Sequence, residues 1–204
     1  MPRTGARGGP QTRAKISEVA TRMFLDSGFD AVTVTDVARE AGVSAVTVFK
    51  HFPRKEDLLL DRQDDAADLL RSAIRDRAPG TGVLPSLREV AYRVLEDRHA
   101  LSGLREGSAP FFRTVAASPA LIARAREIAS DLQRTLADEL DHDPSFTGDA
   151  ALLAAFFVAG YTVVLVETAR RLLDGDPPDT IAPDHRTRLD HLFTALTTGL
   201  GAQP

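Results

Sequence analysis

The amino-acid sequence predicts an all-α protein in which a small N-terminal three-helix domain is followed by a larger helical domain. In most segments the apolar residues recur at the i, i+3, i+4, i+7 spacing of one helical face, and no segment has the pattern of a strand. Glycine and proline residues mark the breaks between these segments. At 204 residues and 43% hydrophobic, the chain is long enough for one or two domains with a substantial core.

Residues 33–58 read TVTDVAREAGVSAVTVFKHFPRKEDL and have the layout of a helix-turn-helix. Thr33 and Asp36 are spaced as in a capping box, in which the threonine oxygen accepts a bond from an orphan backbone N–H. The carboxylate then lies at the positive end of the helix dipole. Gly42 follows the apolar face of this short helix and supplies the unhindered backbone of a tight turn.

A second helix is expected from roughly Ala45 to His51, capped by Ser44. Pro53 ends it, because proline lacks an N–H and disfavours helical backbone at the preceding residue. The helix should bury Val48 and Phe52. The groups expected to face outward, where they can touch DNA, are those of Ala45, Val46, Thr47, Lys50 and His51.

This stretch resembles the DNA-binding domain of the TetR family of bacterial one-component repressors. The resemblance covers residues 12–58, about a quarter of the chain. The matching positions are Thr33, Val37, Ala38, Ala41, Gly42, Val43, Ser44, Thr47, Val48, His51, Phe52, Lys55, Glu56 and Leu58. Val46 departs from the usual glycine, which either changes how close the recognition helix comes to the duplex or offers a methyl-reading surface to thymine. Phe49 replaces the usual tyrosine, so only the packing role of the ring is carried over, without the phosphate-binding hydroxyl.

The resemblance implies an N-terminal helix-turn-helix domain followed by a helical ligand-binding and dimerisation domain. The protein would be a homodimeric repressor that binds double-stranded operator DNA and is released from it by a small-molecule effector, with no membrane partner. Ligand binding would shift the helix expected at 54–77. The DNA-binding residues would be Thr33, Ser44, Ala45, Val46, Thr47, Phe49, Lys50, His51 and Lys55.

The distribution of charge agrees with a nucleic-acid-binding N-terminal part. The net charge is −4, but up to residue 55 there are nine Lys and Arg against five Asp and Glu, and 16 against 24 in the remainder. The two parts therefore carry +4 and −8. The absence of cysteine excludes disulfides and thiolate metal sites, and the N-terminus lacks the layout of a signal peptide. We expect a cytoplasmic protein.

The expected organisation is a flexible basic arm at 1–11, a helix-turn-helix domain at 12–55 and a ligand-binding and dimerisation domain at 56–204. Arg3 and Arg7 of the arm either reach DNA or belong to a solvated tail. Residues 174–183, with two adjacent prolines, are expected to be a loop. The helices are expected at 12–27, 54–77, 85–101, 109–117, 120–140, 150–174 and 184–198.

Residues 150–166 are almost continuously apolar and touch the lower limit of a membrane span at 17 residues. A membrane helix is rejected, because Gly160, Tyr161 and Thr162 dilute the segment and a helix can be apolar all round when it packs on its own core and on a partner. The last helix is expected to complete a two-chain, four-helix interface. Its apolar stripe consists of Leu189, Leu192, Phe193, Leu196 and Leu200.

No catalytic motif is present, and we expect neither an enzyme nor a bound metal or cofactor. Asp141-His142-Asp143, His185 with His191, and Asp97 to His99 have no partners at catalytic spacing. Aromatic and polar residues among the apolar helices are candidates for an effector pocket, of which two or three should line it. They are Tyr92, Arg98, His99, Phe111, Phe112, Arg113, Phe156 and Tyr161. An apolar or aromatic effector, with or without one anionic group, would suit them.

The alternative is an all-helical small-molecule-binding protein or enzyme that does not bind DNA. A regulator should retard duplex DNA from its own upstream region in a gel, and such a protein should not.

Overall fold

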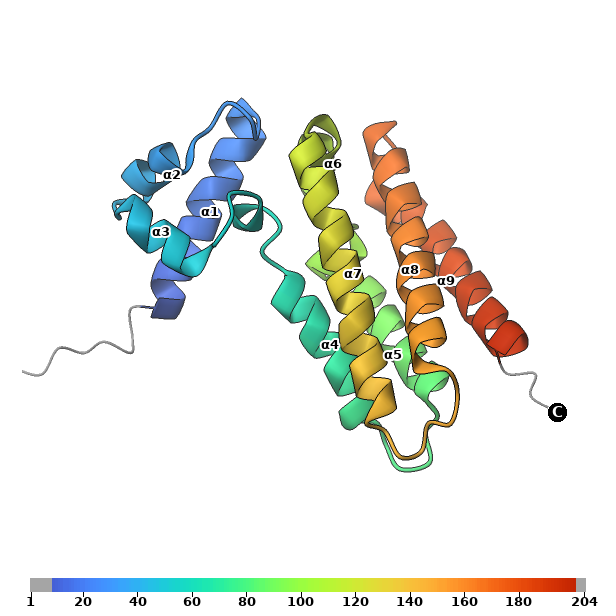
Figure 1. Cartoon of the computed structure of the whole chain (residues 1–204). Coiled ribbons are helices and arrows are strands. Elements are labelled where there is room, and N and C mark those ends of the chain that lie inside the picture. Colours follow the sequence, from blue (N-terminus) through green and yellow to red (C-terminus); the bar gives the residue numbers. More distant parts are fainter. Residues whose placement is uncertain (1–8, 201–204) are drawn as a thin grey trace, which may run out of the picture. The chain divides into compact units, whose positions relative to one another are not determined.

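The computed structural model describes residues 9–200, and within that range every regular element is a helix (Figure 1). The predicted all-α class is therefore confirmed. The expected arm lies outside the described residues as far as residue 8, and residues 9–11 already belong to the first helix. The elements are α1 (Gly9–Ser27), α2 (Val34–Ala41), α3 (Ala45–His51), η1 (Glu56–Leu58), α4 (Gln63–Arg75), α5 (Val83–Glu96), η2 (Ala100–Ser102), α6 (Ser108–Ala117), α7 (Pro119–Asp141), α8 (Ala150–Leu173) and α9 (Pro178–Leu200).

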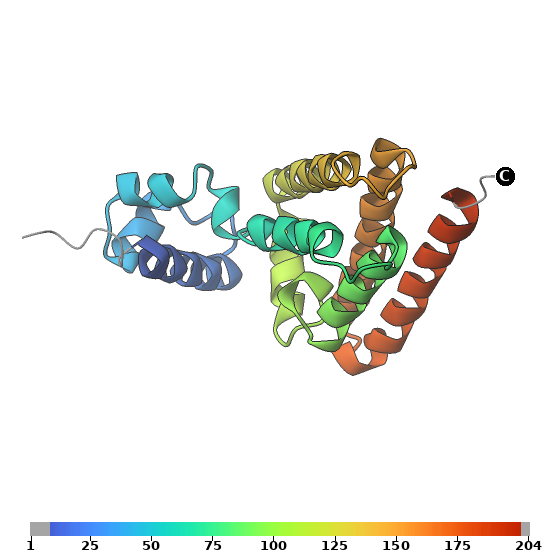
Figure 2. The same ribbon diagram turned by 90° about the horizontal axis from the view of Figure 1, so that it is seen from below.

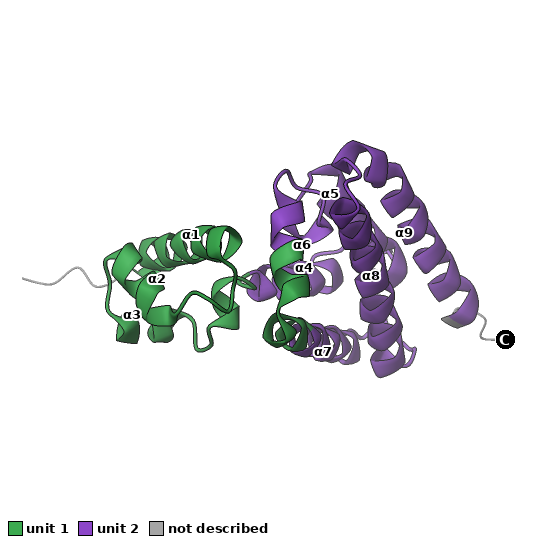
Figure 3. Cartoon of the chain, turned by 90° about the horizontal axis from the view of Figure 1, so that it is seen from above, with its two compact units in different colours: residues 1–61, 113–125 green, residues 62–112, 126–204 purple. Residues whose placement is uncertain are grey.

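The chain divides into two compact units (Figure 3). Unit 1 comprises the chain up to Asp61 together with Arg113–Ala125, and unit 2 comprises Arg62–Phe112 and the chain from Arg126 onward. The turn between α6 and α7 thus belongs to unit 1, although both helices continue into unit 2.

Unit 1 is built around buried side chains that α1, α2 and α3 contribute. Ile16 and Phe24 of α1, Val37 of α2 and Val48 of α3 are fully buried. α1 packs against both α2 and α3, as well as against η1. The apolar spacing that predicted these helices therefore also specifies the faces that meet in this core.

The expectation of a single helix at 54–77 is wrong. The chain forms the short 3-10 helix η1 and starts α4 only at Gln63. The consecutive residues Leu58 and Leu59 are both buried, at 0% and 4% exposed, whereas neighbouring residues on one regular helix point about 100° apart. The break allows both leucine side chains to be buried.

The helix expected to run to residue 101 also ends earlier, at Glu96. Arg98 has left-handed backbone with φ 47°. The N–H groups of Arg98 and His99 return to the carbonyls of Leu95 and Val94, at 3.1 and 3.0 Å. These bonds satisfy carbonyls at the end of α5 and stop the helix.

In unit 2, α9 packs along α8 and against α5, and α4 packs against α5 (Figure 2). Leu189, Phe193 and Leu196 of α9 are buried in this unit's own core, at 0%, 3% and 4% exposed. The expectation that this stripe faces a second chain is therefore wrong. A side chain on Gly160 would overlap Leu192, so the glycine permits a close approach of α8 and α9.

α8 has a buried face and an exposed apolar face. Leu153, Phe157 and Val158 lie in the core. The large apolar side chains on the exposed face are Leu152 (42%), Phe156 (50%), Val163 (63%) and Val166 (63%). By length and composition alone α8 could cross a membrane, a test that the core helix of a soluble protein also passes.

The loop expected at 174–183 is shorter, because α9 begins at Pro178. Proline is tolerated at the first helical position, where the N–H has no partner in any case. Pro183 has no N–H, so the helical hydrogen bond to the carbonyl oxygen of the exposed Asp179 is missing. The helix nevertheless continues through Pro183. Burial of Ile181, which is 1% exposed, holds this first part of α9 on the core.

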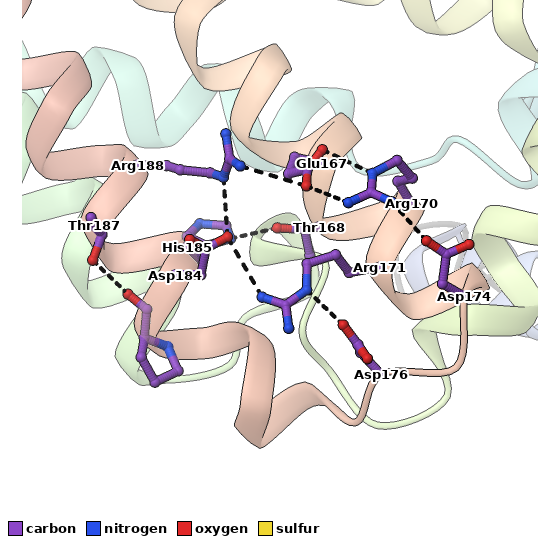
Figure 4. Close-up of polar contacts among 11 residues, drawn as sticks. Glu167, Thr168, Arg170, Arg171, Asp174, Asp176, Asp184, His185, Thr187 and Arg188 are labelled. Atoms are coloured by element: carbon purple, nitrogen blue, oxygen red, sulfur yellow. Dashed lines mark hydrogen bonds and ion pairs between the residues drawn. The ribbon is translucent and has the colours of Figure 1, made fainter.

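Ion pairs fasten the hairpin between α8 and α9 (Figure 4). Arg171 pairs with Asp176 of the loop at 2.7 Å and reaches Asp184 of α9 at 3.6 Å. Arg188 of α9 pairs with Asp184 at 3.1 Å and with Glu167 of α8 at 3.5 Å. Charges from both helices and the loop therefore form one connected network.

A buried polar pair lies beside this network. Nδ1 of His185 and Oγ1 of Thr168 are 2.9 Å apart, and the two residues are 1% and 2% exposed. His185 Nε2 has no hydrogen-bond partner among the described residues. Burial lowers the pKa of His185 to about 4, against a smaller opposing effect of the Asp184 carboxylate.

Candidate nucleic-acid interface

A capping box fixes the start of α2, as the sequence predicted. Thr33 Oγ1 accepts from the backbone N–H of Asp36, and the Asp36 carboxylate accepts from the N–H of Thr33, both at 3.1 Å. The Thr33 hydroxyl also donates to Asp36 Oδ2 at 2.6 Å. These bonds from Thr33, followed by Arg39, hold the pKa of Asp36 below its ordinary value. The threonine hydroxyl is thereby engaged within the domain.

Gly42 forms the turn between α2 and α3 with φ 69° and ψ 34°. This left-handed conformation strains any residue that carries a Cβ. The N–H of Val43 returns to the carbonyl of Ala38 at 2.9 Å, which closes the end of α2. The backbone at Gly42 therefore sets the direction in which α3 leaves α2.

α3 is capped by Ser44 and anchored by two buried side chains. Ser44 Oγ accepts from the N–H of Thr47 at 3.1 Å and lies 2.9 Å from the Thr47 hydroxyl. Val48 is 0% exposed and Phe52 is 1% exposed, in agreement with the predicted inward face. These contacts fix the rotation of α3 about its axis.

The opposite face of α3 presents Val46, Phe49 and Lys50, which are all exposed. Their i, i+3, i+4 spacing places them together on one side of the helix. Lys50 has no hydrogen bond or ion pair with any of residues 9–200. Ala45, Thr47 and His51, which were also predicted to face outward, are half-buried.

Lys55, unlike Lys50, is bonded within unit 1. Its Nζ donates to the carbonyl oxygen of Phe29 at 2.6 Å and lies 4.2 Å from the centre of the Phe29 ring. A charged hydrogen bond and a cation–π contact together hold this side chain against unit 1. The structure thus shows Lys55 joining the segment after α3 to the loop after α1.

Sequence reasoning did not single out Lys15. Its Nζ lies 3.9 Å from the position that a Cβ on Gly42 would occupy, so α1 brings a cation to the helix-turn-helix turn. Arg13, also on α1, lies over the ring of Phe52 at 4.7 Å. No local motif marks either residue, because each meets its neighbour only after α1 packs on α2 and α3.

The candidate pocket residues do not converge on one cavity in the described part of unit 2. Tyr92 donates its hydroxyl to Asp190, receives a bond from Arg88 at 3.0 Å, and has the Arg186 guanidinium 4.6 Å from its ring centre. The bond from Tyr92, with smaller effects of Arg88 and Arg186, lowers the pKa of Asp190. Tyr92 therefore belongs to a charged cluster that joins α5 and α9.

Phe112 and Tyr161 both lie near η2. The Phe112 ring and the Thr168 methyl crowd the backbone at Gly103, where an added Cβ would lie 2.9 and 3.5 Å away. Tyr161 donates to the Leu101 carbonyl at 3.4 Å, and burial raises its pKa. These two aromatic residues thus lie around the same short segment, which His99 of the predicted set also caps. Phe111 lies edge-on to Phe112 with ring centres 5.4 Å apart.

The remaining candidates have other environments. Arg98 pairs with Asp179, Phe156 is half exposed, and Arg113 is exposed within unit 1. His99 caps η2 by accepting from the Leu101 N–H at 3.3 Å. It also borders an open depression of about 620 Å³ whose other lining residues are Asp65, Asp68, Leu69, Arg71, Ser72, Arg75 and Asp76.

His142 and Asp143, considered in the sequence as metal ligands, have structural partners. His142 Nδ1 lies 2.6 Å from the Asp138 carbonyl oxygen. The Asp143 carboxylate pairs with Arg77 and accepts from the Ser145 N–H. Within residues 9–200, no group of three or more His, Cys, Asp or Glu side chains is arranged to hold a metal ion.

Residues 16–61, which contain the larger part of α1 and all of α2 and α3, match the family model of bacterial regulatory proteins of the tetR family. The HTH-type transcriptional repressor KstR2 of Mycolicibacterium smegmatis is 32% identical over 92 residues, which cover 43% of this chain and 45% of KstR2. The HTH-type transcriptional activator FasR of the same organism is 24% identical over 172 residues, or 82% of this chain and 75% of FasR.

Among solved structures, Salmonella enterica GusR superposes with a TM-score of 0.58 at 18% identity, covering 94% of this chain and 96% of GusR. This similarity shows the helical fold over the 94% of the chain that it covers. For the first four curated relatives, the matched segment spans 36–46% of the relative's own length. The chain therefore spans less than half the length of these curated relatives, and the family model covers residues 16–61 alone.

Proposed function

We propose that this chain, which belongs to the tetR family of bacterial regulatory proteins, is a repressor that binds operator DNA and is released from it by a small molecule. The observation that carries the proposal is the outward face of α3. It combines the exposed cation Lys50 with exposed apolar groups on a helix whose other face is locked into the core. The recognition helix of a helix-turn-helix presents such a face to the major groove.

Contacts to the duplex are assigned in two classes. We infer that Lys50 meets a base edge, because a lysine on the recognition helix can bond guanine O6 and N7. Lys15, beside the turn, and the backbone at the start of α3 would meet phosphates, which position a protein without reading sequence. Thr33, Ser44 and Thr47 are bonded among themselves and their neighbours, so their hydroxyls would act mainly by shaping the helix ends.

A gel-shift titration tests DNA binding directly. Duplex DNA from the region upstream of the protein's own gene should be retarded, and an equal mass of unrelated duplex at the same salt should not compete for it. Retardation that unrelated duplex abolishes as readily as unlabelled upstream duplex does would contradict specific operator binding. A footprint that overlaps the promoter supports repression, whereas one upstream of the promoter supports activation, the role that the relative FasR carries in its name.

We propose that the active form is a homodimer joined through the exposed face of α8. Leu152, Phe156, Val163 and Val166 recur on that face at spacings of four, seven and three residues, so they form one apolar stripe. Contiguous exposed apolar side chains of this kind mark interaction surfaces. Two copies related by a two-fold axis would present two α3 helices to successive half-sites of an operator.

The effector would act by a population shift. The effector must bind more tightly to the arrangement that does not fit DNA than to the arrangement that does. Operator DNA then weakens effector binding by the same factor by which the effector weakens DNA binding. The turn between α6 and α7 supports this route, because it is part of unit 1 while both helices continue into unit 2. Ligand binding is assigned to residues 56–204 and DNA binding to residues 12–55, in a cytoplasmic protein.

The effector can be sought in the purified protein itself. Native mass spectrometry should reveal any co-purified small molecule, and that compound should raise the melting temperature and release bound operator DNA. A compound that binds tightly and leaves operator affinity unchanged would contradict the switch. It would leave the DNA-binding function intact.

A further inference from the structure

The outward face of α3 is unusually apolar at its N-terminal end. Val46 is 79% exposed, more than any other large apolar side chain that the structure describes as exposed, and Phe49 is 50% exposed. Val46 is the second residue of the helix, and Phe49 follows it one turn later. Together they place a branched aliphatic group and an aromatic ring side by side in solvent.

The two hydroxyls at this end of α3 are hydrogen-bonded to each other. The hydroxyls of Ser44 and Thr47 lie 2.9 Å apart, and Ser44 Oγ also accepts from the Thr47 N–H. Ala45 and Thr47, on either side of Val46, are half-buried. The first turn therefore offers methyl groups outward, and the nearest exposed side chain on this face that carries a hydrogen-bond donor is Lys50, one turn further along.

We propose that Val46 reads the 5-methyl group of a thymine in each half-site of the operator. The inference rests on the proposed function, in which α3 enters the major groove. Recognition helices of this type place their N-terminal residues at the base edges. Thymine is the base that carries a methyl group there, and apolar side chains discriminate it by contact with that group.

The chemistry accounts for the position of each group on the face. Contact between the Val46 methyls and the thymine methyl removes apolar surface of both partners from water, which favours binding without any hydrogen bond. Phe49 borders the same contact from the next turn and limits access of water to it. Lys50, at i+4 from Val46, supplies the cation for a neighbouring base edge or phosphate.

The size of the effect follows from the free energy of burying one methyl group. Loss of that burial corresponds to about a fourfold loss of affinity per half-site, and roughly 15-fold for an operator with two half-sites. The effect should be confined to one thymine position in each half-site, because a single valine contacts one methyl group.

Uracil substitution tests this inference. An operator is first selected from randomised duplexes with the full chain, and each symmetric pair of thymines is then replaced by deoxyuridine, which removes only the methyl group. Fluorescence anisotropy should show one pair at which the wild-type protein loses roughly 15-fold in affinity. Val46→Ala should bind the thymine operator more weakly and should lose no more than about twofold on uracil substitution at the same pair.

Two controls separate reading from folding and from general binding. Val46→Ala removes only exposed methyls and introduces a stronger helix former, so its melting temperature should not fall below that of the wild type. Lys50→Ala, on the same face, should weaken binding but keep the full sensitivity to uracil at the Val46 position.

Wild-type affinity that is unchanged by uracil at every thymine would overturn the inference, as would full uracil sensitivity in Val46→Ala. Either result would leave operator binding established. Failure to select any preferred sequence refutes the proposed function itself, and the inference about Val46 falls with it.

Discussion

Arg124 donates a hydrogen bond from Nε to Oδ1 of Asp57 at 2.8 Å, and both side chains are largely buried, at 15% and 17% exposed. Arg124 lies near the start of α7 and Asp57 in η1, directly after the helix-turn-helix. The pair therefore ties the turn between α6 and α7 to the segment that follows the helix-turn-helix within unit 1. A second bond in the same region runs from Ser118 Oγ to Asp30 at 3.3 Å.

Breaking this pair should destabilise unit 1. Arg124→Met keeps the apolar stem but leaves Asp57 without its guanidinium partner, so we expect the free energy of unfolding to fall by about 1–3 kcal/mol, between the values typical of exposed and fully buried pairs. Urea denaturation would measure the loss. Arg22→Met, in the exposed pair between Arg22 and Glu40, is the matched control and should cost less than about 1 kcal/mol. Equal losses in both variants would contradict the structural role of the Arg124 pair.

Lys50→Ala should weaken operator binding and change the preferred sequence. Loss of a base-edge contact costs roughly 1–3 kcal/mol of binding free energy and relaxes discrimination at one position. Because Lys50 is exposed, the melting temperature of this variant should stay at the wild-type value. Arg134→Ala removes a comparably exposed cation from α7 and serves as the control. A selection experiment that returned the same site for Lys50→Ala would rule out base reading by this lysine.

Lys55→Met should act on stability instead of on sequence preference. It removes the bond to the Phe29 carbonyl and the contact with the Phe29 ring, so the free energy of unfolding should fall by about 1–3 kcal/mol. The sequence analysis placed Lys55 among the DNA-binding residues, and the alternative is that it contacts a phosphate. If Lys55 contacts a phosphate, Lys55→Met would lower the slope of log Kd against log salt by about one, and the melting temperature would stay constant.

Charge on the exposed face of α8 should separate the proposed dimer. Phe156→Glu with Val163→Glu places two carboxylates where the stripe would be buried, so sedimentation should show monomers and operator affinity should fall. Thr180→Glu adds a carboxylate at an exposed position near the start of α9 and should leave the dimer intact. A stable wild-type monomer at micromolar concentration would contradict the proposed interface.

The buried histidine should make stability depend on pH. His185 has a pKa of about 4 in the folded chain and an ordinary value of 6.5 when unfolded, so the unfolded chain binds more protons between these values. The contribution of the neutral His185 ring to stability is fully present above pH 6.5 and is lost as the pH falls towards 4. The loss amounts to up to about 3 kcal/mol, at 1.36 kcal/mol per pKa unit. His185→Asn keeps a polar atom near Thr168 and removes the titration.

Urea denaturation of the wild type and of His185→Asn across this pH range would isolate the contribution of His185, because all other titratable groups are the same in the two proteins. The wild type should lose more stability than His185→Asn between pH 6.5 and 4. Parallel pH profiles would show that burial of the neutral ring does not govern this loss.

The helix-turn-helix followed from the sequence because its signals are local. Thr33 and Asp36 cap each other across three residues, Gly42 forms the turn by its own backbone, and Ser44 caps α3 through Thr47. Each of these bonds spans no more than one helical turn. A chain segment of that length carries all the atoms that decide the conformation, so its sequence determines it.

Features that depend on distant residues were decided only by the tertiary structure. The stripe of Leu189, Phe193 and Leu196 has the same spacing whether it faces its own core or a partner, and packing against α5 and α8 selected the core. The partner of Lys55 lies 26 residues away, and that of Arg124 lies 67 residues away. Long charged side chains adopt whichever partner the packed helices bring within reach, and spacing along the chain does not contain that information.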